Sequence, residues 1–362
     1  MKILFVVKYP DKYQTQFSSG LDSPETLSYD DLISLLFKDF YGILYSLIYS
    51  LRDSGIEAEL IVPNFKLLQK KWAQENNIQF ADNWEFEIAD EQAKKYQADI
   101  LFFGSNFEYF DTMVPNLKRY SRYACVWISC PFDTAINFSH IDHVFTLFQP
   151  HYDYFTKRGI ASTLTQAGFD PKILESVNSK KEIPLSFIGG IGRYHKRRER
   201  ILKKIIRNFP IKIWGYGYVS DHPFKNFVKQ MANGFAFKKS YMGEAWGLKM
   251  YEILGASGIT INIHGDIADG HAVNMRMFEA TGMGSLLITE YSEGIAKFFT
   301  PDVEVVCYKN ENEAIEKIGY YLTHEEERKK IALAGQKKTL THFTYQTIIK
   351  DYIRVFNSLD KN

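Results

Sequence analysis

The sequence predicts an α/β protein built from two open, mainly parallel β-sheets. Short β-rich runs alternate with longer helical patterns in both halves of the chain, which is typical of parallel strands joined by crossover helices. The length of 362 residues suits two domains. Between Gly168 and Pro184 the chain is polar and has no strand pattern, so we expect the domain boundary there. Ligands of such sheets bind at the carboxyl ends of the strands, and we expect a shared ligand in a cleft between the two domains.

The first half provides strands and helices in alternation after an opening strand. Its β-rich runs predict strands at 3–8, 57–62, 100–104, 125–130, 144–148 and 162–166. Its apolar periodicity predicts helices at 29–54, 85–96, 114–122 and 152–158. The polar segment 11–29 carries glycine and proline breakers and is predicted to be a long loop.

The second half repeats this alternation and ends in helices. Strands are predicted at 185–188, 211–214, 259–263, 285–289 and 303–308. Helices are predicted at 196–208, 224–232, 244–254, 274–282, 311–322, 325–341 and 346–359. We therefore expect a first domain at 1–172, a second domain at 182–345 and a closing helical segment at 346–362.

Composition narrows the class of protein. Lys and Arg total 44 against 43 Asp and Glu, so a strongly charged body is excluded and no nucleic-acid partner is expected. Cys125, Cys130 and Cys307 form no CxxC pair and are predicted to be reduced, buried thiols, as in cytosolic proteins. The amino terminus has no signal-peptide pattern, and the apolar run 40–51 is shorter than the roughly 18 residues that span a bilayer. We expect a cytoplasmic protein without a transmembrane helix.

A glycine-rich turn follows the first strand of the second half. Gly189, Gly190 and Gly192 precede a helix start at Arg193, and backbone N–H groups there can approach an anion while the arginine adds positive charge. This pattern suits a phosphate, although it is neither a dinucleotide fingerprint nor a nucleoside triphosphatase loop. The alternative is a tight turn followed by the solvated basic face of a helix, a reading that applies above all to the run 196–200.

Tyr216 lies between two glycines after the next predicted strand. Its ring could stack on a nucleobase or sugar at the ligand edge of the sheet. It could equally pack on its own loop, and the sequence leaves both readings open.

The stretch 251–291 contains the densest group of polar residues. The predicted strand 259–263 is followed by His264 and several further polar residues, and a helix then begins near Asn274. Arg276 and Glu279 lie three residues apart and share a face of that helix. Such a carboxylate can accept both hydroxyls of a ribose and such an arginine can pair with a diphosphate. A simple ion pair on the helix surface is the alternative.

At this point the chain resembles the group-1-type glycosyltransferases, in particular the branch of spore-maturation CgeB-like proteins. Two blocks carry the resemblance, TINIHGDIADGHAVNMRMFEATGMGSLLITE and VEVVCYKNENEAIEKIGYYLTHEEERKKIALAG, together with SFIGGIGR and the closing HFTY. The resemblance implies the GT-B arrangement of two Rossmann-like domains, with the closing helix returning to the first. It also implies a nucleoside diphosphate sugar as donor substrate, held mainly by the second domain, and no cofactor or metal.

Individual donor-site residues follow from the same resemblance. Glu279 matches the acidic residue that binds the donor ribose, and Arg276 matches the arginine three positions before it. His271 stands where many relatives carry a second glutamate, which leaves the sugar contact and the stereochemical course open. The resemblance also matches Gly189, Gly190 and Arg193 to the phosphate-facing loop, and Asn262 and His264 to the polar residues at the strand end. From their own positions in the sequence, Tyr216 and Asn274 are also expected to bind the donor.

An inverting transfer also needs a general base near the acceptor hydroxyl. We expect the first domain to supply it from Asp133, which follows a predicted strand, or from His151, and we keep His271 as a third catalytic candidate. Asp133 could instead cap a helix, and His151 could be a structural histidine. His140, Asp142 and His143 have only loose metal-ligand spacing, and we expect no metal there.

The function predicted from these residues is transfer of a sugar to a glycan, a lipid-linked acceptor or a protein, as in polysaccharide biosynthesis. The apolar, tyrosine-rich helix 32–51 could touch a lipid-linked acceptor at the membrane face, or its aromatic side chains could fill the first domain's core. A nucleotide-sugar epimerase of GT-B fold and a non-catalytic sugar- or nucleotide-binding protein are the alternatives.

Overall fold

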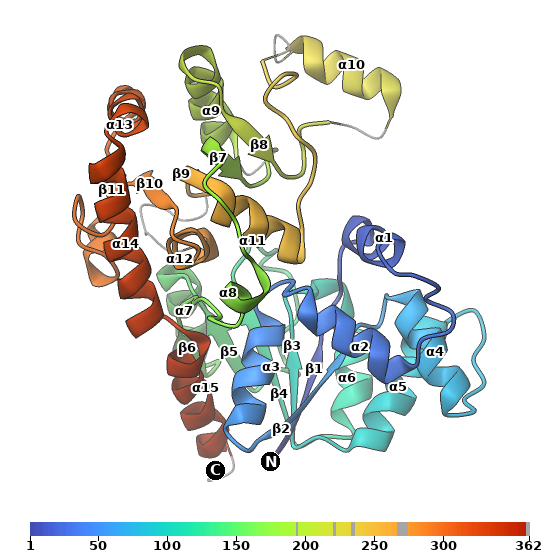
Figure 1. Ribbon diagram of the computed structural model, residues 1–362. Coiled ribbons are helices and arrows are strands. Elements are labelled where there is room, and N and C mark those ends of the chain that lie inside the picture. Colours follow the sequence, from blue (N-terminus) through green and yellow to red (C-terminus); the bar gives the residue numbers. More distant parts are fainter. Residues whose placement is uncertain (193–194, 220–221, 233–235, 266–273, 360–362) are drawn as a thin grey trace. The chain divides into compact units, whose positions relative to one another are not determined.

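The computed structural model describes residues 1–192, 195–219, 222–232, 236–265 and 274–359, and these form two compact units (Figure 1). The first unit comprises Met1–Gln166 and Ile348–Asn362, and the second comprises Ala167–Thr347. Each unit contains one parallel β-sheet flanked by helices. This is the predicted fold class, two Rossmann-like α/β domains.

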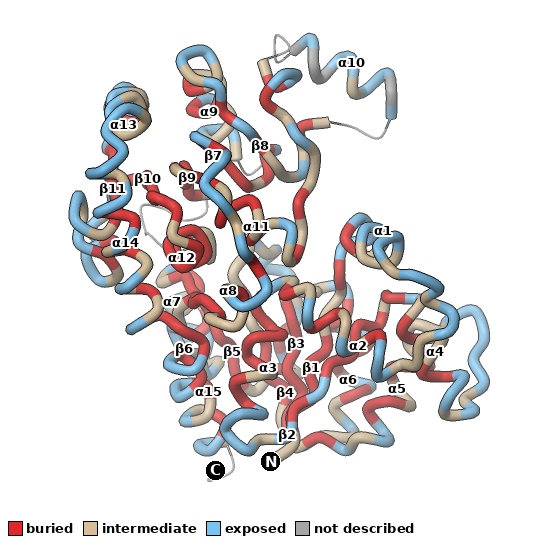
Figure 2. Tube along the Cα trace, viewed as in Figure 1, coloured by how far each residue is buried: buried red, intermediate tan, exposed pale blue. Residues whose placement is uncertain are grey.

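The first unit has a six-stranded sheet in the order β2-β1-β3-β4-β5-β6, with every neighbouring pair parallel. Its inner strands β3 and β5 are wholly buried because helices cover both faces, whereas the edge strands β2 and β6 are partly exposed (Figure 2). The strands are β1 (Lys2–Val6), β2 (Glu57–Ile61), β3 (Ile100–Phe103), β4 (Tyr123–Ile128), β5 (His143–Thr146) and β6 (Ser162–Leu164).

The closing helix of the chain packs on one face of this sheet. On α15 (Tyr345–Leu359), Tyr352 stacks on Phe145 with ring centroids 4.5 Å apart, and Phe356 meets Phe102 edge-on at 6.1 Å. Buried residues of α5 (Trp84–Tyr96), α6 (Met113–Lys118) and α7 (Gln149–Thr156) form a cluster with the opposite face. The predicted return of the closing helix to the first domain is therefore confirmed.

Two helical predictions in the first unit need correction. The expected helix 29–54 is divided into α2 (Tyr29–Lys38) and α3 (Leu44–Asp53), because Phe40 and Gly42 adopt positive φ angles of 54° and 80° between them. The expected loop 11–29 contains α1 (Asp11–Ser19), whose Tyr13 is buried and stacks on Tyr41. The sequence reading also omitted α4 (Lys66–Glu75).

The second unit has a five-stranded parallel sheet in the order β11-β10-β9-β7-β8. Its strands are β7 (Ile183–Ile188), β8 (Lys212–Trp214), β9 (Ser257–Asn262), β10 (Leu286–Glu290) and β11 (Val306–Tyr308). Its helices are α8 (Ile173–Ser176), α9 (Lys196–Asn208), α10 (Pro223–Ala232), α11 (Gly247–Ala256), α12 (Met275–Gly282), α13 (Glu311–Thr323) and α14 (Glu325–His342).

The two faces of the second sheet differ in chemistry. One face is apolar and packs against buried residues of α9 and α13. The other carries buried hydroxyls that bond across neighbouring strands: Thr260 lies 3.2 Å from Ser186 and 2.7 Å from Ser285, oxygen to oxygen. Because each hydroxyl has a partner, polar side chains are held inside this face at little cost. They tie β7, β9 and the start of β10 together beneath the site.

The polar segment predicted as the domain boundary lies within the second unit. Phe169 donates its N–H to the Phe343 carbonyl at 2.8 Å, and its ring packs so closely on Gly282 that a Cβ there would lie 2.4 Å from the ring. These contacts group residues 167–172 with the second unit rather than with the first.

The burial predicted for the three cysteines holds for two of them. Cys125 and Cys307 are buried, as expected, whereas Cys130 is only partly buried, and all three thiols are free. Burial raises the pKa of the Cys307 thiol to about 12. Among the described residues, no helix is long and apolar enough to cross a membrane.

Candidate functional site

The first part of the site is a pair of glycine loops at the carboxyl ends of β7 and β8. Gly189 donates its N–H to the Trp214 carbonyl at 2.9 Å, and Ile191 donates to the Tyr216 carbonyl at 3.0 Å. At Gly215, φ is +140° and a Cβ would lie 2.3 Å from the Gly189 carbonyl oxygen. Only glycine allows the two loops to approach this closely. The loop predicted to face a phosphate is therefore held in place by its neighbour.

Tyr216 packs on the first of these loops. Its ring covers Gly190 so closely that a Cβ there would lie 2.3 Å from the ring. Half of the tyrosine nevertheless remains exposed, at 50%. One side of the ring therefore packs on its own loop, as the alternative reading expected. Stacking of a base or sugar on the exposed side stays a prediction.

Arg198 holds the ends of β7 and β9 together from the basic helix α9. Its Nη1 donates to the Gly190 carbonyl at 2.6 Å, and its Nε and Nη2 donate to the Ile263 carbonyl at 3.2 and 2.8 Å. Burial lowers the pKa of this guanidinium. The sequence reading treated this arginine as part of a solvated face, and that reading is wrong for Arg198. Arg193, the arginine predicted to face a phosphate, lies outside the described residues.

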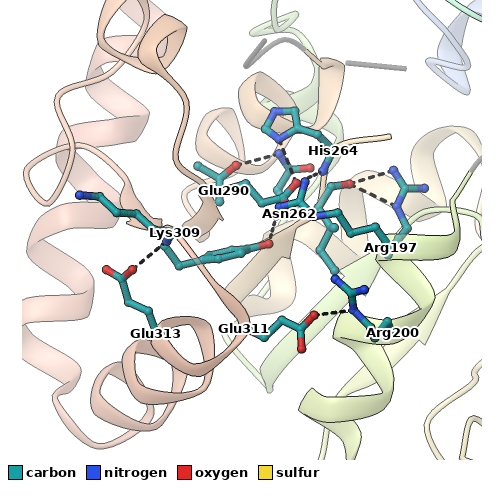
Figure 3. Close-up of polar contacts among 12 residues, drawn as sticks. Arg197, Arg200, Asn262, His264, Glu290, Lys309, Glu311 and Glu313 are labelled. Atoms are coloured by element: carbon teal, nitrogen blue, oxygen red, sulfur yellow. Dashed lines mark hydrogen bonds and ion pairs between the residues drawn. The ribbon is translucent and has the colours of Figure 1, made fainter. Parts of the chain in front are cut away.

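A buried carboxylate at the end of β10 fixes the residue that follows β9. Glu290 Oε2 accepts the His264 backbone N–H at 2.7 Å and lies 3.6 Å from His264 Nδ1 (Figure 3). The Oε1 atom of Glu290 lies 2.5 Å from Arg197 Nη2. The Nε2 atom of His264 is buried and has no hydrogen-bond partner within the described part of the chain. His264 therefore has an oriented ring with one nitrogen available to a ligand.

Two asparagines connect the strand ends to the start of α12. Asn262 donates its amide to Thr289 Oγ1 at 3.0 Å and accepts from Asn274 Nδ2 at 2.9 Å. Asn274 caps α12 by accepting the Met277 N–H at 3.2 Å. The structure thus brings both predicted residues together, and their hydrogen bonds position the start of α12. Direct contact with a donor stays a prediction for both.

The predicted Arg276–Glu279 pair lies on α12, where Glu279 is buried and Arg276 is partly buried. Arg276 Nη1 is 2.9 Å from Glu279 Oε2, and little of either side chain is exposed. Burial raises the pKa of Glu279, opposed by the charge of Arg276 and by a hydrogen bond with Tyr251. The alternative of a solvated surface pair is therefore wrong.

Arg276 keeps unused donor capacity. Its Nε and Nη1 atoms are buried and make no hydrogen bond to the residues that the structure describes, although Nη1 is close to the Glu279 carboxylate. Guanidinium N–H groups left unpaired inside a protein are costly, and a phosphate or carboxylate satisfies them well. This side chain is suited to an anionic ligand.

The catalytic candidates of the first unit lie near the ends of β4 and β5. Asp133 is exposed and accepts the Ala135 N–H at 2.9 Å in a turn, so it does not cap a helix. His151, on α7, is buried between the rings of Phe132 and Phe148, with centroids 5.0 and 5.3 Å away. Burial lowers the pKa of His151. Either role as a general base stays a prediction, and His271 lies outside the described residues.

The residues with loose metal-ligand spacing are engaged separately. Asp142 Oδ2 accepts from Lys118 Nζ and from the Ala124 N–H, both at 2.7 Å. His143 Nε2 lies 2.9 Å from Thr163 Oγ1, and burial lowers the pKa of this histidine to about 4. Among the residues described, no three or more His, Cys, Asp or Glu side chains are grouped as metal ligands.

The sequence reading missed two residues of the site for which a signal exists. Glu290 is the last residue of a buried strand, the position from which a side chain reaches the ligand edge. Arg198 lies three and four residues before the buried Ile201 and Leu202, so helical spacing places it on the inward face of α9. The strand-end position of Glu290 and the helical spacing of Arg198 distinguish these two residues from the solvent-exposed charges near them.

Part of the second unit and the closing helix match a known protein family. Residues 197–354 match a family described as glycosyl transferase-like, a region that includes Arg198, Glu279 and Glu290. No curated protein matches the chain.

Solved structures match over nearly the whole chain. They include a sucrose-phosphate synthase from Thermosynechococcus elongatus, with a TM-score of 0.57, 8% identity and 100% of both chains covered. A second is Anabaena HepE in complex with UDP and glucose, with a TM-score of 0.57, 11% identity, and 99% of this chain and 100% of that one covered. A third is a glycosyltransferase from Rickettsia africae, with a TM-score of 0.57, 14% identity, and 100% and 99% covered.

At these identities the structural likeness defines the fold, which is that of the GT-B glycosyltransferases. It confirms the predicted fold, two Rossmann-like domains, and the glycosyl transferase-like match covers residues 197–354 within the second half of the chain.

Proposed function

We propose that this protein moves a sugar from a nucleoside diphosphate sugar to a glycan, lipid-linked or protein acceptor, and that it holds the donor at the carboxyl edge of the second unit's sheet. The observation that carries the proposal is the Arg276–Glu279 pair, in which the carboxylate is buried and the arginine keeps buried N–H groups without hydrogen bonds to the described residues. The RMFEATGMGSLLITE block further supports placement in the CgeB-like branch.

Each side chain at this edge has a distinct role in the proposal. Glu279 accepts the ribose hydroxyls and Arg276 donates to the diphosphate. Arg198 adds a fixed positive charge beside Gly190, where the phosphate-facing loop begins. His264 Nε2 supplies one further polar contact, held in position by Glu290.

The chemistry requires stabilisation of a leaving diphosphate as the bond to the anomeric carbon breaks. Fixed cations and helix termini can neutralise that charge, and loss of one such contact costs about 3 kcal/mol in the barrier, or about 100-fold in rate. Asp133 and His151 are the proposed sources of a general base. Because HepE is described in complex with UDP and with UDP-glucose, uridine diphosphate sugars are the first donors to test.

A thermal-shift titration with UDP, GDP and TDP tests the donor site. A ligand at 100 times its Kd stabilises the folded state by about 2.7 kcal/mol. We expect one of these nucleotides to raise the Tm of the wild-type protein, and the rise to be lost in Glu279→Ala and reduced in Glu279→Gln. Each shift is measured against the ligand-free Tm of the same variant, which separates binding from any loss of stability.

The matched control is Glu252→Ala. Glu252 is a partly exposed glutamate of α11 that pairs with Lys249 at 2.9 Å, and its loss should leave the nucleotide response intact. An unchanged response in Glu279→Ala would place the donor elsewhere. Product analysis then identifies the reaction, since transfer releases nucleoside diphosphate together with an elongated acceptor, whereas an epimerase converts the donor alone.

A further inference from the structure

Helix α10 of the second unit carries an apolar face that the described residues leave uncovered. Four of its apolar side chains are largely exposed: Phe224 at 70%, Phe227 at 56%, Val228 at 49% and Met231 at 56%. Figure 2 shows the described part of this helix as largely exposed. Large apolar side chains are commonly exposed singly, but four on one short helix form a patch.

The spacing of these residues places them side by side. Taking Phe224 as position i, the others stand at i+3, i+4 and i+7, which is the pattern of a single apolar stripe. The polar residues of the same helix, such as Lys225 and Asn226, fall between these positions and therefore on other faces. A stripe of this kind is normally buried against a neighbouring element.

The charged residues within the sequence segment 222–243, which contains the stripe, have one sign. Lysines stand at positions 225, 229, 238 and 239, and no aspartate or glutamate occurs between His222 and Gly243. A basic helix with phenylalanines on its apolar face is the pattern of helices that lie in the interface of a membrane. Each lysine near a surface of anionic lipid adds attraction, which salt screens.

We propose that α10 is a membrane-docking element that inserts its apolar stripe among the acyl chains of a bilayer rich in anionic phospholipid, with the surrounding lysines at the headgroups. A second copy of this chain fits the surface less well, because facing stripes would bring the same lysines together without acidic partners. An anionic bilayer complements both the apolar stripe and the charge. This proposal is independent of the donor site, because none of its residues belongs to the Arg276–Glu279 group.

Co-sedimentation of the full-length protein with vesicles tests the proposal. One set of vesicles consists of phosphatidylcholine alone, and the other contains phosphatidylcholine with phosphatidylglycerol. We expect binding to the anionic vesicles that weakens as salt is raised. The double variant Phe227→Ser/Met231→Ser should lose about tenfold or more in partitioning, because it removes two of the four inserted side chains.

Leu333→Ser provides the matched control. Leu333 is 64% exposed on α14, so this change removes an equally apolar side chain from a different surface of the same unit. The control should bind vesicles like the wild type, and thermal melts should show that all variants are folded. The nucleotide-dependent rise in Tm should persist in the double variant, which distinguishes failure of this proposal from failure of the donor site.

Two outcomes would overturn the proposal. In the first, the wild-type protein ignores anionic vesicles, or Phe227→Ser/Met231→Ser binds them as well as the wild type does. In the second, sedimentation velocity shows that the wild type self-associates without lipid and that the double variant is a monomer, which would assign the stripe to a second copy of the chain.

Discussion

The carboxyl edges of the two sheets have opposite electrostatic characters. In the second unit, Arg276, Glu279 and Glu290 are withdrawn from solvent and held in ion pairs. In the first unit, the charged residues near the strand ends remain at the surface, as with Asp133 and the Lys8–Glu108 pair. The buried histidine there, His151, is surrounded by aromatic rings. One edge is therefore ionic and buried, while the other is neutral in its interior.

This difference indicates where an anionic ligand belongs. A buried charge costs free energy unless it is paired and hydrogen-bonded. Even a paired buried charge often adds little to the stability of the folded protein, so stability alone seldom explains its presence. In the second unit the buried carboxylates are Glu279 on α12 and Glu290 at the end of β10. Next to Glu279 lie N–H groups of Arg276 that make no hydrogen bond to the described residues. The arrangement is understandable if a diphosphate completes it, whereas the first unit keeps its charged residues at the surface and has no comparable ion pair described in its interior.

The sharpest way to break this contrast is to remove the cation of the buried pair. Arg276→Met leaves Glu279 without a counter-charge inside the second unit, and breaking such a pair costs about 3–5 kcal/mol. We expect a loss of unfolding free energy of that size, measured by urea denaturation, together with loss of the nucleotide response. In this variant the pKa of Glu279 should rise further, because the charge of Arg276 is what lowers it.

Because the pKa of the Glu279 carboxyl group is raised, the unfolding free energy of Arg276→Met should depend on pH. The folded state then holds more protons than the unfolded state, so stability falls as pH rises from the unfolded pKa toward the folded one. Arg276→Met should accordingly be least stable at neutral pH and should recover part of its stability near pH 5. A loss that is independent of pH would mean that packing, rather than the carboxylate, is responsible. Exposed Arg354→Met, whose residue pairs with Asp351 on α15, is the control.

The first unit should respond to pH with the opposite sign. Burial lowers the pKa of His143 to about 4 from an ordinary value near 6.5, so below pH 6.5 the unfolded chain binds a proton that the folded unit refuses. The first unit should therefore lose stability as pH falls from 6.5 to 4, by on the order of 3 kcal/mol from this residue. Hydrogen exchange of peptides from β5 and β4, followed across this range, measures the effect in this unit alone.

Substitution of His143 tests whether this residue causes the acid-induced loss of stability. In His143→Gln the side chain can still bond to Thr163 but does not titrate, so the acid-induced loss should shrink. His151, whose pKa is lowered in the same direction, should account for part of what remains. If peptides of β5 lose protection on acidification as steeply in His143→Gln as in the wild type, His143 is not the titrating group.

The sequence predicted some features of each unit and missed others. Alternating patterns determined the fold class, and the helix spacing of Arg276 and Glu279 placed both on one face of α12. Spacing alone could not show whether that face is buried, since burial depends on Tyr251 from α11 and on how α12 packs against the sheet. The division of the helix at 29–54 was missed for a related reason, because Phe40 adopts a positive φ that no residue pattern indicates.

Glu290 offers the finest test, because it can be compared with Glu311, a partly exposed carboxylate that also pairs with an arginine. Glu290 pairs with Arg197 and accepts the His264 N–H, whereas Glu311 pairs with the exposed Arg200 at 2.6 Å. We expect Glu290→Ala to lower the unfolding free energy by about 2 kcal/mol, since it removes a hydrogen bond to a charged acceptor and leaves a buried N–H unpaired.

Glu311→Ala should cost less than about 1 kcal/mol, because its partner Arg200 is exposed and solvent screens the ion pair. Glu290→Gln, whose amide oxygen can still accept the His264 N–H, should fall between the two in urea denaturation. If both alanine variants lose the same free energy, burial contributes nothing at this position. The ionic character of the edge would then rest on α12 alone, and His264 would need another residue to hold it toward the donor.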